Sequence, residues 1–249
     1  MAEDFIDRIA EKLPIKQIYN DAIGPAAKEA GAIGEDLIKT LRLALVPFQF
    51  TAAFQDRVAH FIDKSVRAVP EDRRVAPPPQ IIGPVLEGIR YEPEDTPIDE
   101  MFSALLSNSM DQARFDTAHP SFPILIRQLS RDEAVILKEL ASRNFSTVEK
   151  LDKNLERRSD DEPYWVNRVI EKQLDFPFDK LLIPHKFDFY SNHMFNLGLA
   201  CYSKTRGQEV IRDASGKQIG TRKFQDFHLM PLGRALVEAC TRDAAQASE

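Results

Sequence analysis

The stretch Ile82–Ser130 constrains the fold more than any other part of the chain, because short helix-forming blocks alternate in it with residues that end helices. Pro84 and Pro97 each suit the first turn of a helix, where the N–H that proline lacks has no partner in any case. Thr96 precedes Pro97 and is a good N-cap residue. The pattern predicts short helices whose apolar residues supply a core.

Two further helix starts lie at the end of this stretch. Ser130 is followed three residues later by Glu133, so each side chain can bond the backbone N–H of the other, as in a capping box. Upstream, His119 and Ser121 precede another apolar block, and Ser121 is expected to cap that helix.

Residues 1–70 predict three linked helices. The first has an apolar face that stops at Pro14, the second runs from about Pro25 to Val46, and the third covers roughly Phe50–Val69. Glycine and alanine on the second helix leave room for another helix to approach closely. We expect an elongated arm that contacts a protein partner or a second copy of the chain.

A proline-rich segment, Pro70–Gln80, follows the arm. Its three consecutive prolines favour an extended, fairly stiff connector, and a domain boundary is expected there. The predicted division is a helical arm at 1–70, a linker with the central helical block at 71–129, and a third domain at 130–249.

The third domain ends in the element order of a winged helix. Phe189–Leu197 predicts a helix that Gly198 ends. Two strand candidates follow, Ala200–Ile211 and Gln218–Met230, joined by the turn Asp213–Gly216, and a last helix comes after them. The predicted fold class is mainly α, with an N-terminal helical arm and helical core followed by a C-terminal winged-helix-like α+β domain.

The segment Asn144–Pro184 has the weakest pattern. Trp165, Val169 and Ile170 indicate one amphipathic helix, and the charged run Glu156–Glu162 is typical of a solvated loop.

Composition points to an ordinary globular chain. A net charge of −6 argues against a nucleic-acid coat protein. The two cysteines, Cys201 and Cys240, give no disulfide framework and are expected in the core. The acidic, amphipathic N-terminus is not a signal peptide, and Leu43–Phe54 is shorter than the roughly 20 residues that span a bilayer. We expect a cytoplasmic protein, with peripheral membrane contact left open.

Several short motifs, in order, resemble the abortive-infection alpha (Abi-alpha) family of bacterial phage-resistance proteins. The motifs are Gly24–Glu29, Gly83-Pro84, Leu86-Glu87, Arg90-Tyr91, Met101-Phe102, Leu105-Leu106, Ser109-Met110, His119–Phe122 and Ile126–Ser130. The family's acidic turn is replaced here by Pro93–Pro97, and Glu149–Lys186 match none of its motifs. The resemblance implies antiviral defence and carries no catalytic residues with it.

The chain contains no recognisable catalytic motif. It has no CxxC, HExxH or HxH metal pattern and no glycine-rich phosphate loop. Cys201 with His193, and Ser121 with His119, could each be read as a nucleophile and its base, but a core position and a helix start explain them better. We expect no enzymatic activity, no cofactor and no metal.

A local excess of cations is the one functional indication that charge provides. Six lie in the predicted hairpin, against Glu209 and Asp213: Lys204, Arg206, Arg212, Lys217, Arg222 and Lys223. Such cations can contact a phosphate backbone, and they also keep the edge of a sheet soluble.

Three functional hypotheses remain. The first is a bacterial anti-phage protein of the abortive-infection type that acts by binding, sensing or assembly. The second is a nucleic-acid-binding winged-helix regulator that uses the basic hairpin. The third is a membrane-acting effector whose N-terminal helices insert into a bilayer.

Overall fold

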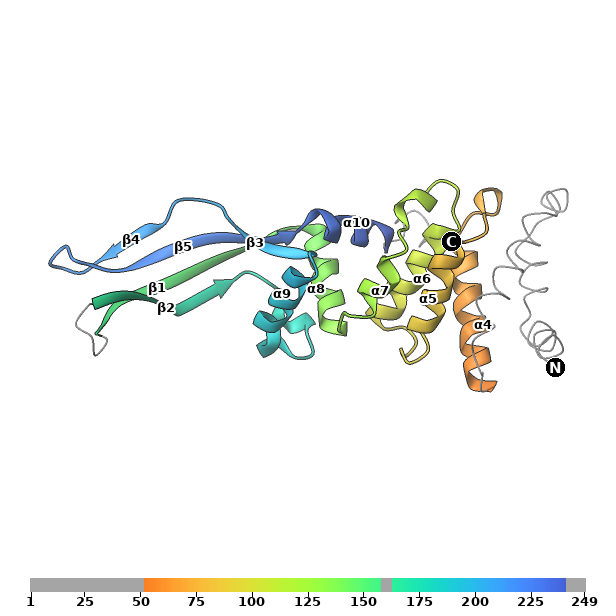
Figure 1. The fold of residues 1–249 in the computed structure, drawn as a ribbon, viewed down its shortest axis with the longest axis horizontal. Coiled ribbons are helices and arrows are strands. Elements are labelled where there is room, and N and C mark those ends of the chain that lie inside the picture. Colours follow the sequence, from red (N-terminus) through yellow and green to blue (C-terminus); the bar gives the residue numbers. More distant parts are fainter. Residues whose placement is uncertain (1–51, 158–162, 241–249) are drawn as a thin grey trace. The chain divides into compact units, whose positions relative to one another are not determined.

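The computed structural model describes residues 52–157 and 163–240 (Figure 1). The chain divides into two compact units, unit 1 from Met1–Ala134 and Ala235–Glu249, and unit 2 from Val135–Arg234. The arm helices predicted before Ala52 lie outside the described residues, and so do the self-association and membrane contact expected of them. The three-part division at residues 70 and 129 stays a prediction.

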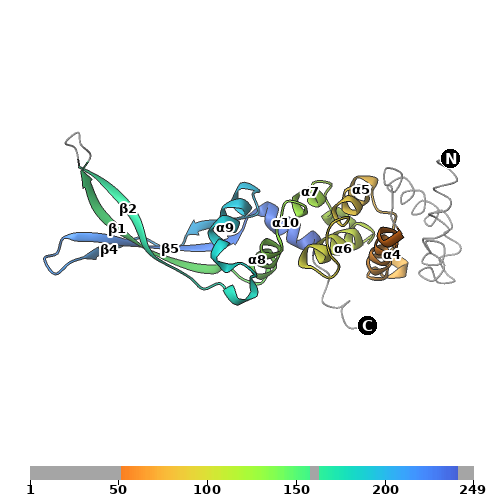
Figure 2. The same ribbon diagram turned by 90° about the horizontal axis from the view of Figure 1, so that it is seen from below.

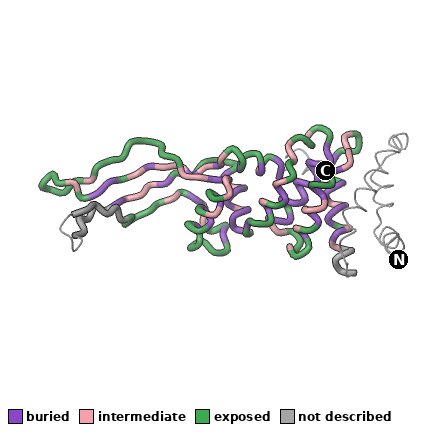
Figure 3. The backbone as a smooth tube through the Cα atoms, in the orientation of Figure 1, coloured by how far each residue is buried: buried purple, intermediate pink, exposed green. Residues whose placement is uncertain are grey.

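Helix α6 is the centre of unit 1. Helices α4, α5 and α7 each contact it, and every residue from Met101 to Met110 is buried (Figure 3). The described elements of this unit are α4 (Ala52–Arg67), η2 (Glu71–Arg73), α5 (Pro79–Gly88), α6 (Pro97–Ser109), η3 (Phe115–Thr117), α7 (Phe122–Ile126), the start of α8 (Arg131–Ser142) and the end of α10 (Pro231–Ala239).

A helix buried on all sides must satisfy its own polar side chains, and α6 does so partly through serines that face α4. Ser65 Oγ lies 3.0 Å from Ser103 Oγ, and the Ser107 hydroxyl donates to the Ser65 carbonyl at 2.9 Å. These small side chains allow close approach of the two helices and give each buried hydroxyl a partner.

Asp99 ties the start of α6 to α4. Asp99 is 1% exposed, and its carboxylate forms ion pairs with Arg57 Nη2 at 2.5 Å and with Lys64 Nζ at 3.4 Å. The Asp99 N–H donates to Thr96 Oγ1 at 3.1 Å, which confirms the predicted N-cap. A charge this deeply buried is stable only while its cations stay in place.

The other predicted helix starts have mixed outcomes. The capping box is confirmed, since the Ser130 N–H donates to Glu133 Oε2 at 2.7 Å. Helix α5, however, begins at Pro79, so placing Pro84 in its first turn was wrong. The last of the three prolines starts the helix, because the first helical position needs no N–H.

Helix α7 does follow Ser121, but the Ser121 side chain makes no cap bond. Instead the imidazole of His119 accepts the Ser121 N–H at 3.2 Å and lies 2.8 Å from its hydroxyl. The pair belongs to the turn that starts a helix.

Unit 2 is built, within its described residues, on a five-stranded antiparallel sheet. Its strands are β1 (Phe145–Arg157), β2 (Pro163–Leu174), β3 (Ala200–Lys204), β4 (Glu209–Arg212) and β5 (Gln218–Leu229). The order is β2-β1-β5-β3, and β4 also pairs with β5. Strand β5 is therefore bonded along both edges.

Helix α9 (Phe187–Asn196), preceded by η4 (Phe178–Lys180) and η5 (Pro184–Lys186), lies against one face of this sheet. The ring of Phe187 is 5.7 Å from Phe227 on β5 and 5.1 Å from Phe176, which lies 4.9 Å from Phe145 on β1. Such aromatic pairs each add about 0.5–1.5 kcal/mol beyond their buried area. This cluster fixes which face of β1 and β5 points inward.

Strands β1 and β5 pair from Phe145–Phe227 as far as Asp152–Gly220. Beyond that point the β1–β2 and β4–β5 hairpins separate (Figure 2). A Cβ on Gly220 would lie 2.5 Å from the Leu151 carbonyl oxygen, so only glycine fits where the two hairpins part. A bulge lies beside it, because Lys150 pairs with Glu171 while Leu151 pairs with Val169.

The predicted fold class was wrong in being mainly α, because the sheet forms much of unit 2. The error arose where Trp165, Val169 and Ile170 were assigned to an amphipathic helix, since all three belong to strand β2. The bulge leaves Ile170 as an extra residue and breaks the period of two, which imitates helical spacing. Of the predicted loop, Glu156 and Arg157 lie in β1, and 158–162 lie outside the described residues.

The predicted winged-helix-like arrangement was also wrong, because strands β1 and β2 were not predicted. The predicted hairpin exists, as β3 and β4 against β5, and its turn is closed by the Asp213 N–H donating to the Lys217 carbonyl at 2.9 Å. Gly198 ends α9 with φ +73, as predicted. The long β1–β2 hairpin, absent from the prediction, makes β5 a central strand.

Replacing Asp99 by alanine should destabilise unit 1 by about 3 kcal/mol, because Arg57, only 12% exposed, loses its closest carboxylate. Calorimetry of the full chain should show the melting of this unit lowered by roughly 6–12 °C.

The control is Asp63→Ala, which breaks the exposed Asp63–Arg67 pair on α4 and should change stability by about 0.5 kcal/mol or less. Equal effects of the two variants would refute the role given to Asp99.

Candidate functional site

The register of the sheet places one set of charged and apolar side chains on the face opposite α9, which we call the outer face. Val148 pairs with Phe224, and Lys150 pairs with Arg222. These positions alternate with Phe145, Phe227 and their neighbours, which point toward α9. The side chains on the outer face are therefore not those that form the aromatic core.

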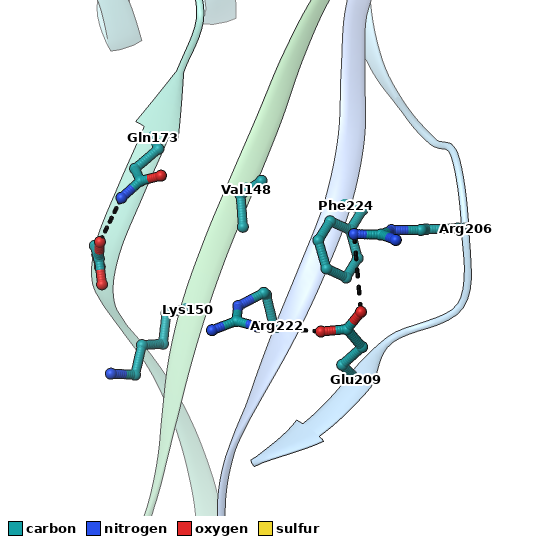
Figure 4. A pocket seen from close by; sticks show the side chains of 8 residues that line it. Val148, Lys150, Gln173, Arg206, Glu209, Arg222 and Phe224 are labelled. Carbon is teal, nitrogen blue, oxygen red and sulfur yellow. Dashed lines mark hydrogen bonds and ion pairs between the residues drawn. The ribbon is translucent and has the colours of Figure 1, made fainter.

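A groove of about 340 Å³ lies on the outer face, just before the two hairpins separate (Figure 4). Its lining comes from β1, β2, β5, β4 and the β3–β4 loop: Val148, Lys150, Glu171, Gln173, Arg206, Glu209, Arg222 and Phe224. Five segments of chain thus contribute to one surface.

Phe224 is the apolar floor of this groove, and Arg206 covers it. The guanidinium carbon of Arg206 lies 3.5 Å from the centre of the Phe224 ring, close enough for a cation–π contact. The loop that carries Arg206 is anchored by the Thr205 N–H, which donates to the Phe224 carbonyl at 3.1 Å. Arg206 itself is exposed, so its charged edge remains available to solvent.

Glu209 on β4 lies between two arginines of the groove. Its carboxylate is 3.1 Å from Arg222 Nη1 and 3.8 Å from Arg206 Nη2 (Figure 4). Both pairs are exposed, and exposed ion pairs contribute about 0–1 kcal/mol. Glu209 therefore lies within ion-pair distance of both guanidinium groups and binds neither tightly.

The six cations predicted from sequence do not form one patch. Arg206 and Arg222 line the groove, but strand alternation puts Lys223, opposite Glu149, on the α9 side of the sheet. Lys204 pairs with Gln225 and takes that same side.

The remaining two, Arg212 and Lys217, flank the β4–β5 turn. Arg212 Nη1 donates to the Gly216 carbonyl at 2.8 Å, and the Lys217 N–H donates to Asp213 Oδ1 at 3.0 Å. Hydrogen bonds, first that from Ser215, lower the pKa of Asp213. These cations therefore frame a rigid turn and do not line the groove.

Half of the groove was missed because β1 and β2 were not predicted. Val148, Lys150, Glu171 and Gln173 all come from these strands. The run Phe145, Thr147, Leu151 did carry a period-two signal, but the charged Glu149 in phase with it and the apolar Val148 out of phase hid it.

None of the helices in the described segments is long and apolar enough to cross a membrane. Within residues 52–157 and 163–240, no three His, Cys, Asp or Glu side chains gather in a way that could hold a metal ion.

Comparison with known proteins settles the family. The model of the abortive infection alpha family matches residues 49–240, which include both hairpins and all residues of the groove. Comparisons with curated proteins and with solved structures gave no match. The family match confirms the resemblance found in the sequence motifs and covers more than half of the chain. This chain therefore belongs to the abortive infection alpha family.

Proposed function

We propose that this protein acts in the defence of a bacterium against phage by binding a component of the infection in the outer-face groove. Membership of the abortive infection alpha family supports the role in abortive infection. The groove supports the mode of action, because it presents preformed charges around an apolar floor. Its ligand is a polypeptide segment that carries both signs of charge.

The balance of charge favours a polypeptide over a nucleic acid. The described side chains that line the groove include three cations (Lys150, Arg206, Arg222) and two carboxylates (Glu171, Glu209). Duplex DNA carries about one negative charge per 1.7 Å of its axis, so a surface that binds it needs a larger positive excess. The two carboxylates leave the lining with a net charge of only about +1, and Glu209 is already paired with Arg206 and Arg222.

The groove is also arranged for a ligand with an acidic and an apolar side chain. A carboxylate of the ligand can replace Glu209 on Arg222 at little cost, because the present pair is exposed and contributes about 0–1 kcal/mol. An apolar side chain can pack on Val148 and on the edge of Phe224. Arginine and aromatic side chains are the residues that most often dominate such interfaces.

The double substitution Arg206→Glu and Arg222→Glu should abolish protection. Two reversed charges should weaken ligand binding by at least about tenfold, since an arginine that dominates an interface contributes about 2 kcal/mol or more. Phage plating efficiency on cells that express each protein at equal abundance, with folding checked by circular dichroism, measures the effect.

The matched control is Arg212→Glu with Lys217→Glu, which makes the same change of charge at the β4–β5 turn. We expect this variant to protect like the wild type. Full protection by a folded Arg206→Glu, Arg222→Glu variant would rule the groove out.

A second candidate function is nucleic-acid contact by the cations outside the groove. The observation that favours it is the exposed pair Arg212 and Lys217 at a turn held by Asp213. Lys204 and Lys223 would extend that contact from the neighbouring strands.

Anisotropy titrations with labelled DNA and RNA over a salt series test this second candidate. Lys217→Glu should reduce the salt slope by about one, as expected for one lost phosphate contact. The control Lys186→Glu, an equal change on η5, should leave the slope unchanged. Binding that is absent, or that does not depend on salt, excludes nucleic-acid contact at this turn.

A further inference from the structure

Cys201 and His228 form a hydrogen-bonded pair on the outer face. Neither residue lines the groove to which the proposed function is assigned. They lie directly opposite each other in the register of β3 and β5. Cys201 Sγ is 3.6 Å from His228 Nε2, within hydrogen-bond reach for sulfur. The sequence had suggested His193 as a base for Cys201, but the imidazole beside the thiol is His228.

The second ring nitrogen of His228 determines the direction of this hydrogen bond. Nδ1 lies 3.2 Å from the Asp226 carbonyl oxygen, which can only accept, and 3.3 Å from Ser203 Oγ. Nδ1 therefore carries the proton, and Nε2 is left as an acceptor for the Cys201 S–H. A cysteine whose thiol donates to a held imidazole is arranged to lose its proton to that imidazole.

The charged groups around the pair come from three elements. Asp226 shares the outer face and bonds Ser146, while Lys204, one residue beyond Ser203 on β3, takes the α9 side. Arg234 on α10 donates to the Leu229 carbonyl at 2.7 Å, next to His228. The elements that carry the pair or adjoin it thus contribute both an acidic and a basic residue.

Cys240 provides an internal contrast. Both cysteines are free, but Cys201 is half-buried whereas Cys240 is buried. Burial raises the pKa of the Cys240 thiol, so it holds its proton and resists attack. One chain thus contains one half-buried thiol beside a base and one buried thiol.

We propose that Cys201 is a nucleophilic thiol, with His228 as its base, and a site of oxidation by small peroxides. His228 Nε2 takes the thiol proton, and the sulfur attacks one peroxide oxygen. The O–O bond breaks, the sulfur is oxidised by two electrons to a sulfenic acid, and the departing hydroxide takes the proton from His228 and leaves as water. The chain has only one other cysteine, Cys240, so thiols outside the chain, such as low-molecular-weight thiols, reduce the sulfenic acid.

Two labelling measurements on the full-length protein test this proposal. Iodoacetamide at pH 7 should alkylate Cys201 at least about fivefold faster in the folded wild type than in the same protein unfolded in urea, as expected for a base-assisted thiol. After a brief hydrogen peroxide treatment, a 1,3-diketone probe should trap sulfenic acid on Cys201. Peptide mass spectrometry reports both cysteines separately, and Cys240 should stay unlabelled until the protein is unfolded.

His228→Asn should lower both reactions of Cys201 by about fivefold, because the amide keeps a donor near the Nδ1 position and removes Nε2. The matched control is His193→Asn, the same change on α9, which leaves the pair intact and should stay within about twofold of the wild type. The proposal is overturned if folded wild-type Cys201 reacts no faster than the unfolded thiol, a result that does not depend on any variant. It is also overturned if a folded His228→Asn variant matches the wild type.

Discussion

Pairing of strand β5 along both of its edges is the constraint on which unit 2 depends. One edge bonds β1, and the other bonds β3 and then β4. Because side chains alternate along a strand, this pairing fixes Phe227 toward α9 and Phe224 and His228 toward the outer face. A slip of one residue would exchange the two sets, placing charged side chains in the aromatic core and losing both the groove and the Cys201–His228 pair.

Unit 1 depends on a different constraint, the complete burial of α6. The motifs that identify the family fall largely on this helix and on the segments around it. Polar residues that lie between or just before these motifs satisfy buried groups, as Ser103 and Ser107 do against α4 and Asp99 does with Arg57. Residues that look functional in the sequence because they are polar are structural here.

Local signals in the sequence predicted several helix ends and the second hairpin, although not the cap at Ser121, because each rests on a few neighbouring residues. Thr96, Ser130 and Gly198 all act as expected. The first hairpin was not predictable in the same way, because a bulge at Ile170 shifts its pattern toward helical spacing and its partner strand β5 lies far along the chain. The candidate site was therefore predicted only in part. Arg206 and Arg222 were identified from charge alone, whereas Lys150 and Glu171 could be assigned to the site only once strands β1 and β2 were known.

The bulge between Lys150 and Leu151 has a consequence for how this fold can vary between relatives. It lies just before the last β1–β5 pair, Asp152–Gly220, and beyond that pair the described strands are bonded only within their own hairpin. Residues added or removed in matched pairs beyond this point change the reach of the β1–β2 ribbon but leave Lys150 and Glu171 in register. The length of the ribbon can therefore change without changing which residues line the groove.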